Sequence, residues 1–88
     1  MLKPSEQQAA LASHINSLGI ALFDRWCECR NVIPLAYLMH AWPLVAPSLP
    51  TIDRLSQTLR ELLTNHAHSL APDDREIIDH MISCLNTW

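Results

Sequence analysis

Glycine is almost missing from this sequence: Gly19 is the single one in 88 residues. Loops that cradle phosphate groups need several closely spaced glycines, so the sequence excludes the phosphate-binding loops of nucleotide-dependent enzymes. Basic residues are also few, since six Lys and Arg stand against nine Asp and Glu, and they are scattered along the chain. A nucleic-acid-binding protein needs a clustered positive surface. We therefore expect neither nucleotide chemistry nor binding to nucleic acid.

Charged side chains are absent from one long stretch, between Arg30 and Asp53. Its central part, residues 32–47, is apolar almost throughout. A membrane-spanning helix needs about 20 consecutive apolar residues, whereas this part has 16 residues and is interrupted by Pro34, Pro43 and Pro47. We therefore expect no integral membrane insertion, and we expect a packed surface to cover this segment.

The cysteines Cys27, Cys29 and Cys84 are an odd number, which does not suit a framework of disulfides. The first residues, Met-Leu-Lys-Pro-Ser-Glu-Gln, lack the charged and then apolar layout of a secretory signal peptide. Both features favour a reducing compartment, and we expect a cytoplasmic location.

Apolar residues recur at steps of three or four along the chain, and no segment alternates as a strand does. This spacing predicts an all-α fold, a small bundle of about four helices that forms a single domain over residues 1–88. A Pro-rich connector is expected between the second and third helices, because Pro43 ends the second and Pro47 and Pro50 keep the following backbone extended.

The first helix is expected to begin at Ser5, which forms a capping-box pattern with Gln8, and to run to about Arg30. Gly19 lies inside this helix, where glycine costs about 1 kcal/mol relative to alanine, so it indicates a break or a close helix crossing. We favour one unbroken helix. Its predicted buried stripe consists of Leu11, Ile15, Leu18, Leu22, Trp26 and Cys29.

The second helix is expected to be capped by Asn31, to carry Pro34 in its first turn and to end at Trp42. Ser48 or Thr51 is expected to cap the third helix, and Pro72 to open the fourth, with Asp73 and Asp74 at its positive dipole end. The predicted inner faces are Ile52, Leu55, Leu59, Leu62 and Leu63 on the third helix, and Ile77, Ile78, Met81, Ile82, Leu85 and Trp88 on the fourth.

Metal binding is the sharpest chemical hypothesis, because His80 and Cys84 are four residues apart and share a helix face. Cys29 or His66 would complete a zinc site with them. Residues two apart on a helix point about 200 degrees apart, so the pairs Cys27/Cys29 and His66/His68 do not chelate while helical. A small metal-binding or thiol-based enzyme or sensor using His66, His80 and Cys84 is therefore the alternative function, whereas the main interpretation includes no metal and no other cofactor.

Catalysis has weaker support. Cys27, Cys84, His14, His40 and His80 are residue types that nucleophilic catalysis uses, but no local pattern typical of a catalytic family surrounds them. We therefore expect a protein that is not an enzyme.

The apolar second helix supports the preferred function, a non-enzymatic protein–protein interaction module such as a small adaptor, chaperone or inhibitor. A helix that is apolar all round must be covered all round, and Tyr, Trp and Met are enriched at the energetic centres of interfaces. Its cover is a second copy in a homodimer, a different protein, or the chain's own bundle. The acidic last helix would add steering toward a basic partner surface. The predicted partner-binding residues are Leu35, Tyr37, Leu38, Met39 and Trp42.

Overall fold

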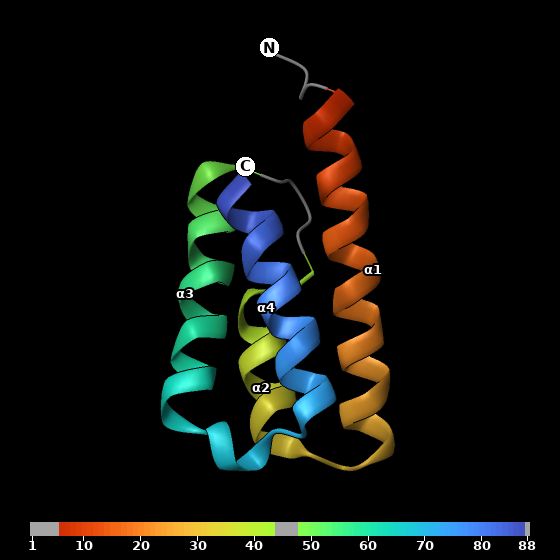
Figure 1. Cartoon of the computed structure of the whole chain (residues 1–88), viewed down its shortest axis with the longest axis vertical. Helices are drawn as coiled ribbons and strands as arrows, with labels where there is room; N and C mark the ends of the chain where they lie inside the picture. The colour runs from red at the N-terminus through yellow and green to blue at the C-terminus, as the bar shows by residue number, and fades with distance from the viewer. Residues whose placement is uncertain (1–5, 44–47, 88) are drawn as a thin grey trace.

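The computed structural model describes residues 6–43 and 48–87, and within them it contains helices and no strand. The predicted all-α fold of about four helices is confirmed. The helices run alternately down and up a bundle (Figure 1). Helices α1 and α3 each pack against both α2 and α4. The elements are α1 (Glu6–Glu28), α2 (Val32–Ala41), α3 (Leu49–Asn65), the short 3-10 turn η1 (Ala67–Ser69) and α4 (Pro72–Thr87).

Helix α1 is continuous through Gly19, so the prediction of one unbroken helix is confirmed. Gly19 is buried because the indole of Trp42, just after α2, lies directly against it. A Cβ atom at Gly19 would lie 2.5 Å from Trp42 Cε2, closer than any ordinary contact between carbon atoms. The indole Nε1 of Trp42 also donates a hydrogen bond to Asn16 Oδ1 at 3.2 Å. The single glycine therefore permits the close crossing that the sequence left as one of two possibilities.

Helix α1 ends at Glu28, so Cys29 lies beyond the helix and is exposed, and its predicted place in the buried stripe is wrong. The backbone turns there, since Arg30 has a positive φ of 55° and Asn31 N–H donates to the Trp26 carbonyl at 2.8 Å. Ser5, the predicted cap, lies outside the described residues.

The connector between α2 and α3 differs from the prediction, because Pro50 belongs to α3 and not to the connector. Pro50 lies in the first turn of α3, where its missing N–H has no intrahelical partner to lose. Pro47 lies outside the described residues, and Pro43 follows Trp42, the C-cap residue of α2. Ser48 is the residue that caps α3, and its backbone N–H donates to the Thr51 hydroxyl at 2.9 Å.

The core is formed by the inward stripes of all four helices. Removing a buried leucine side chain from such a core costs about 2–5 kcal/mol, so these positions dominate the stability of the fold. Trp88, predicted to belong to this core, lies outside the described residues. The fully or almost fully buried members are Ile15, Leu22, Trp26, Leu38, Ile52, Leu55, Leu59, Leu62, Ile78, Met81 and Leu85.

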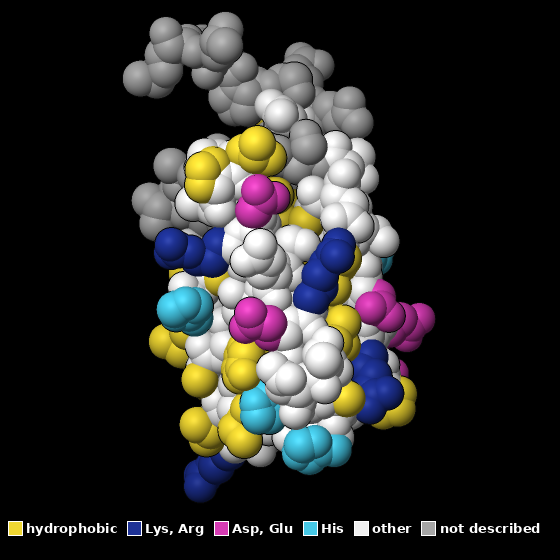
Figure 2. Space-filling view, turned by 90° about the vertical axis from the view of Figure 1, so that its left-hand side faces the viewer, with side chains coloured by type: hydrophobic (Ala, Val, Ile, Leu, Met, Phe, Trp, Pro, Cys, Tyr) yellow, Lys and Arg dark blue, Asp and Glu magenta, His cyan; other side chains and the backbone are white. Residues whose placement is uncertain are grey.

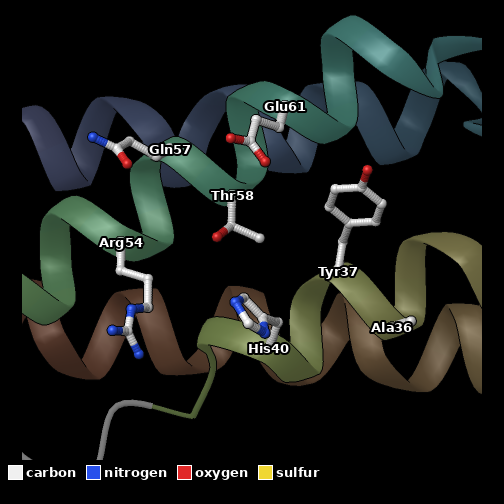
Figure 3. Close-up of a pocket in the computed structure, with 7 residues that line it drawn as sticks. All are labelled: Ala36, Tyr37, His40, Arg54, Gln57, Thr58 and Glu61. Carbon is white, nitrogen blue, oxygen red and sulfur yellow. The ribbon is translucent and has the colours of Figure 1, made fainter.

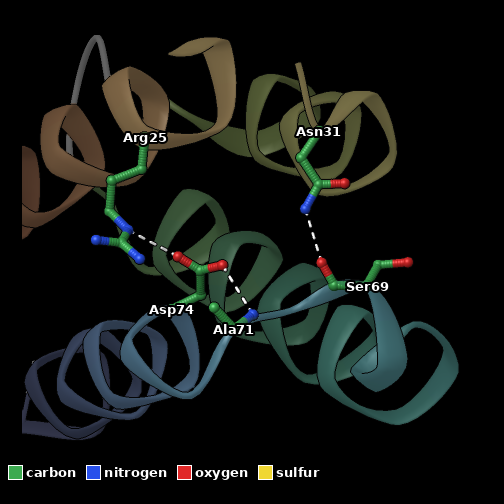
Figure 4. Close-up of polar contacts among 5 residues, drawn as sticks. All are labelled: Arg25, Asn31, Ser69, Ala71 and Asp74. Carbon is green, nitrogen blue, oxygen red and sulfur yellow. Dashed lines mark hydrogen bonds and ion pairs between the residues drawn. The ribbon is translucent and has the colours of Figure 1, made fainter. Parts of the chain in front are cut away.

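One end of the bundle is fastened by polar contacts (Figure 4). Asp74 Oδ1 accepts a hydrogen bond from Arg25 Nε at 2.8 Å, and Asp74 Oδ2 accepts one from the Ala71 N–H at 3.0 Å. Asn31 Nδ2 donates to the Ser69 carbonyl at 2.7 Å. Asn31 stands at the start of α2 as predicted, but its side chain makes no capping hydrogen bond there. Asn31 instead joins the α1–α2 turn to the segment that precedes α4, and Asp74 joins α4 to Arg25 on α1.

Within residues 6–43 and 48–87, none of the helices combines the length and the apolar character that crossing a membrane requires.

Candidate functional site

The outward side of α2 is apolar. Val32 is 68% exposed, Met39 is 59% exposed and Ile33 is 45% exposed. Ala36 and His40 are the other exposed residues of this helix, and His40 is the single polar side chain among the five. Since Val32, Ala36 and Met39 are four and three residues apart, they form one stripe along the helix. This stripe, together with Ile33 and His40 beside it, is the outer face of α2.

The other short helices of the bundle have polar outer sides. Figure 2 shows the molecule from its α3 side, with charged side chains of both signs across the centre and hydrophobic side chains gathered along the lower left edge. A soluble helix typically places apolar residues inward and charged residues outward, as α3 and α4 do. The outer face of α2 departs from this rule. The exposed polar side chains are Asp53, Arg54, Gln57, Arg60, Glu61, Thr64 and Asn65 on α3, and Asp73, Arg75, Glu76, Asp79, His80, Ser83, Asn86 and Thr87 on α4.

The five predicted partner-binding residues occupy different environments. Met39 is on the outer face, and Leu35 and Tyr37 are half-buried at its edges. Leu38 is 0% exposed and belongs to the core, so it does not lie on a contact surface and is removed from the predicted set. Trp42 is half-buried, packed on α1 beside Gly19 and 6.3 Å from the ring of Phe23, measured between ring centroids. Contacts with α1 therefore cover part of the Trp42 side chain that was predicted to contact a partner.

A groove of about 490 Å³ runs between α2 and α3 (Figure 3). Tyr37 and His40 line it from α2, and Arg54 and Glu61 line it from α3 with opposite charges. The Tyr37 ring also makes an edge contact with the ring of His66, with 5.2 Å between centroids. Along the side that faces α3, the apolar outer face of α2 is therefore bordered by polar and charged side chains.

A second candidate site lies on the seam between α1 and α4. His14, His80 and Cys84 place their ligand atoms within 4.8 Å of one another. The two histidines are joined by their Nε2 atoms at 3.1 Å, with one nitrogen donating and the other accepting. Both histidines are exposed, whereas Cys84 is 8% exposed. These residue types are ligands of transition metals, so this cluster is where the described part of the chain could hold an ion.

The predicted ligand set is corrected in one respect, because His14 joins His80 and Cys84 in place of His66 or Cys29. His66 follows the last residue of α3, at the connection to α4. Cys84 lies 12 residues after the start of α4, so roughly 18 Å of helix separates it from that connection. His66 instead contacts Tyr37 and His68.

Two of the buried titratable groups have shifted pKa values. Burial raises the pKa of the Cys84 thiol, so the neutral thiol is favoured while no cation is near it. Burial alone would raise the pKa of Asp74 as well, but hydrogen bonds from Arg25 and the Ala71 N–H lower it below its ordinary value. The indole of Trp26 contributes in the same direction, although its N–H does not reach hydrogen-bond geometry with any acceptor. Asp74 is therefore a charged anchor between helices.

The sequence did not indicate His14 as a ligand or Val32 and Ile33 as exposed residues of α2. His14 is 66 residues from His80, and no local spacing connects residues so far apart. The signal for Val32 and Ile33 was present, because both belong to the uncharged stretch after Arg30. Which side of an apolar helix faces outward, however, depends on its neighbours.

Comparison with models of known protein families, with curated proteins and with solved structures finds no match to this chain.

Proposed function

We propose that this chain is a small non-enzymatic protein-interaction module that acts through the outer face of α2. The observation that carries the proposal is the exposure of Val32, Ile33 and Met39 on a helix that carries no acidic or basic residue other than His40. Exposed apolar side chains grouped on one surface are typical of interaction sites. The function class is that of an adaptor, chaperone or inhibitor, which works by contact and not by chemistry.

The first occupant that we propose for this face is the same face of a second copy. Twofold pairing brings each uncharged residue against another uncharged residue, so it buries no unpaired charge. A basic or acidic partner would find no complementary charge on this helix. The acidic side chains of α4 are a weaker attraction than the sequence suggested, because Asp74 is already paired with Arg25.

The expected dimer is weak. Full burial of a Val, Ile or Met side chain contributes about 1.5–3 kcal/mol, and these three are already partly covered within the monomer. About 1 kcal/mol for each of six side chains across a symmetric pair gives roughly 6 kcal/mol, from which the cost of association is subtracted. Half-buried neighbours such as Leu35 and Tyr37 add to this sum. Once these neighbours are counted and an association cost of at least about 4 kcal/mol is subtracted, about 4 kcal/mol remains, which corresponds to a dissociation constant of about 1 mM.

Sedimentation equilibrium tests this proposal with Met39→Asp as the probe. The substitution removes an apolar side chain from both copies, so it should weaken the dimer about 30-fold, equivalent to about 2 kcal/mol. Ser83→Asp is the matched control, because it adds the same charge at an exposed position of α4, a helix that does not neighbour α2 in the bundle. A wild-type chain that stays monomeric at millimolar concentration refutes self-pairing, and equal dimerisation of wild type and Met39→Asp refutes the assigned face.

The proposal also includes a reducing cytoplasmic setting, which is supported by the three cysteines being free thiols. Addition of a mild oxidant should then lower the amount of native monomer through the exposed Cys27 and Cys29, and non-reducing electrophoresis measures the effect.

A further inference from the structure

From the placement of His14, His80 and Cys84, we infer that this chain binds one Zn²⁺ ion between its first and last helices. The three side chains supply two imidazole nitrogens and one thiol sulfur, which are the ligand types that zinc prefers. The site is on the α1–α4 seam and does not depend on any role of α2.

The packing of the two helices sets the register that creates this cluster. Arg25 on α1 contacts Asp74 on α4 at one end of the seam. The helices are antiparallel, so residues equally far from this pair lie level with each other. His14 is eleven residues before Arg25 and Leu85 is eleven residues after Asp74, which places His14 level with the neighbour of Cys84. His80 lies one turn before Cys84 on the same face of α4. The Arg25–Asp74 ion pair and the helix repeat therefore place the ligands together.

The distances match what a tetrahedral zinc ion requires after a small adjustment. With zinc–nitrogen bonds near 2.0 Å and zinc–sulfur bonds near 2.3 Å, ligand atoms lie roughly 3.3 to 3.6 Å apart. The two Nε2 atoms are already 3.1 Å apart, and all three ligand atoms lie within 4.8 Å. A shift of Cys84 Sγ by about 1 Å, which a χ1 rotation of roughly 30° supplies, closes the set.

The chemistry of binding can be written for each ligand. Both rings bind zinc through Nε2, so each must carry its proton on Nδ1, and the hydrogen bond between the two Nε2 atoms is replaced by the ion. The Cys84 thiol releases its proton to solvent and binds as thiolate. Three protein ligands leave a fourth position for water or an external ligand, which is the arrangement of an open zinc site.

The surroundings favour a cation. Glu76 lies one turn before His80 and Asp79 directly precedes it, while Arg75 is the single basic residue of α4. A groove of about 420 Å³ along the same seam is lined by His80 together with Glu76, Asp73 and Arg25, so solvent reaches the cluster, and the Arg25 charge is already paired with Asp74. The acidic groups lower the cost of bringing a doubly charged ion to this seam.

Titration of the reduced full chain with Zn²⁺, followed by calorimetry, tests the inference. We expect one ion per chain and a higher thermal midpoint when zinc is bound, because binding to the folded state alone stabilises it. His14→Ala and Cys84→Ala should each weaken binding by at least about 100-fold, since even groups that only support a ligand contribute roughly 10–100-fold. The matched controls are His68→Ala and Cys27→Ala, which change an exposed histidine and an exposed cysteine outside the cluster.

Co²⁺ provides a second measurement that identifies the ligands. A tetrahedral site with a thiolate gives cobalt intense visible bands and a sulfur-to-cobalt band in the near ultraviolet, and the sulfur band should vanish in Cys84→Ala alone among the cysteine variants. Circular dichroism of each variant checks folding, and His14→Ala, at an exposed position, keeps the test decisive if Cys84→Ala does not fold. No binding to the wild type, or binding unchanged in His14→Ala, overturns the inference.

Discussion

Replacement of Gly19 by alanine should destabilise this protein, although alanine is the better helix former. A Cβ atom at this position would lie 2.5 Å from Cε2 and Nε1 of Trp42 and 2.9 Å from Cζ2. The indole cannot simply swing away at no cost, because it donates to Asn16 and packs near Phe23. The ring must therefore move by about 1 Å to restore ordinary contact distances.

The expected magnitude follows from three contributions. Alanine in a helix interior gains about 1 kcal/mol over glycine. Loss of the Trp42–Asn16 hydrogen bond costs about 1 kcal/mol, and loss of indole packing costs about 1–2 kcal/mol. The net result is a decrease of about 1 kcal/mol, with an upper limit near 2 kcal/mol, in the free energy of unfolding.

The same substitution should stabilise a chain that lacks the indole. In a Trp42→Ala background, Gly19→Ala meets no ring and should raise the free energy of unfolding by about 1 kcal/mol. The coupling between the two positions is then about 2–3 kcal/mol. Urea denaturation of all four chains, followed by far-ultraviolet circular dichroism, measures it. If Gly19→Ala stabilises both backgrounds equally, the close crossing of α1 and Trp42 is refuted.

Two further predictions concern the polar contacts at the end of the bundle. Asp74→Asn should lower the free energy of unfolding by on the order of 1–2 kcal/mol at neutral pH, because the charged acceptor of the Ala71 N–H and of half-exposed Arg25 is lost. Because the pKa of Asp74 is lowered in the folded state, its contribution to the free energy of unfolding is complete above the unfolded pKa of about 3.9 and disappears as the pH falls through the folded pKa. The midpoint of urea denaturation should therefore fall more steeply between about pH 6 and pH 2 for wild type than for Asp74→Asn. Asn31→Ala should cost about 1 kcal/mol by removing the hydrogen bond to the Ser69 carbonyl, and amide exchange of the η1 segment should speed up while that of the α3 centre does not.

The fold was predictable from the sequence because the apolar spacing of each helix is local information. Helices α3 and α4 begin where Ser48 and Pro72 indicated, and the inner faces were correctly assigned at Leu55 and Met81. The exceptions are residues whose place depends on a neighbouring helix. Pro50, for example, is equally compatible with an extended connector and with a first helical turn, and it lies in the first turn of α3.

The candidate sites were less predictable for the same reason. The uncharged stretch identified α2 as the unusual helix, but its sequence alone did not distinguish buried Leu38 from exposed Met39. The ligand pair His80 and Cys84 was visible from its spacing, whereas His14 depends on the antiparallel register of α1 and α4. Asp74 was expected only to interact with a helix dipole, and its pairing with Arg25 comes from tertiary packing.

Met39 permits a direct test of the outer face of α2 as a contact surface. Met39 is 59% exposed and Met81 is 0% exposed, so their side-chain methyl groups are a probe and an internal control in one molecule. A soluble paramagnetic agent should broaden the Met39 methyl resonance in dilute protein and progressively less as the concentration rises, while Met81 stays unaffected throughout. A Met39 methyl group that remains equally accessible from micromolar to millimolar concentration contradicts self-pairing through this face.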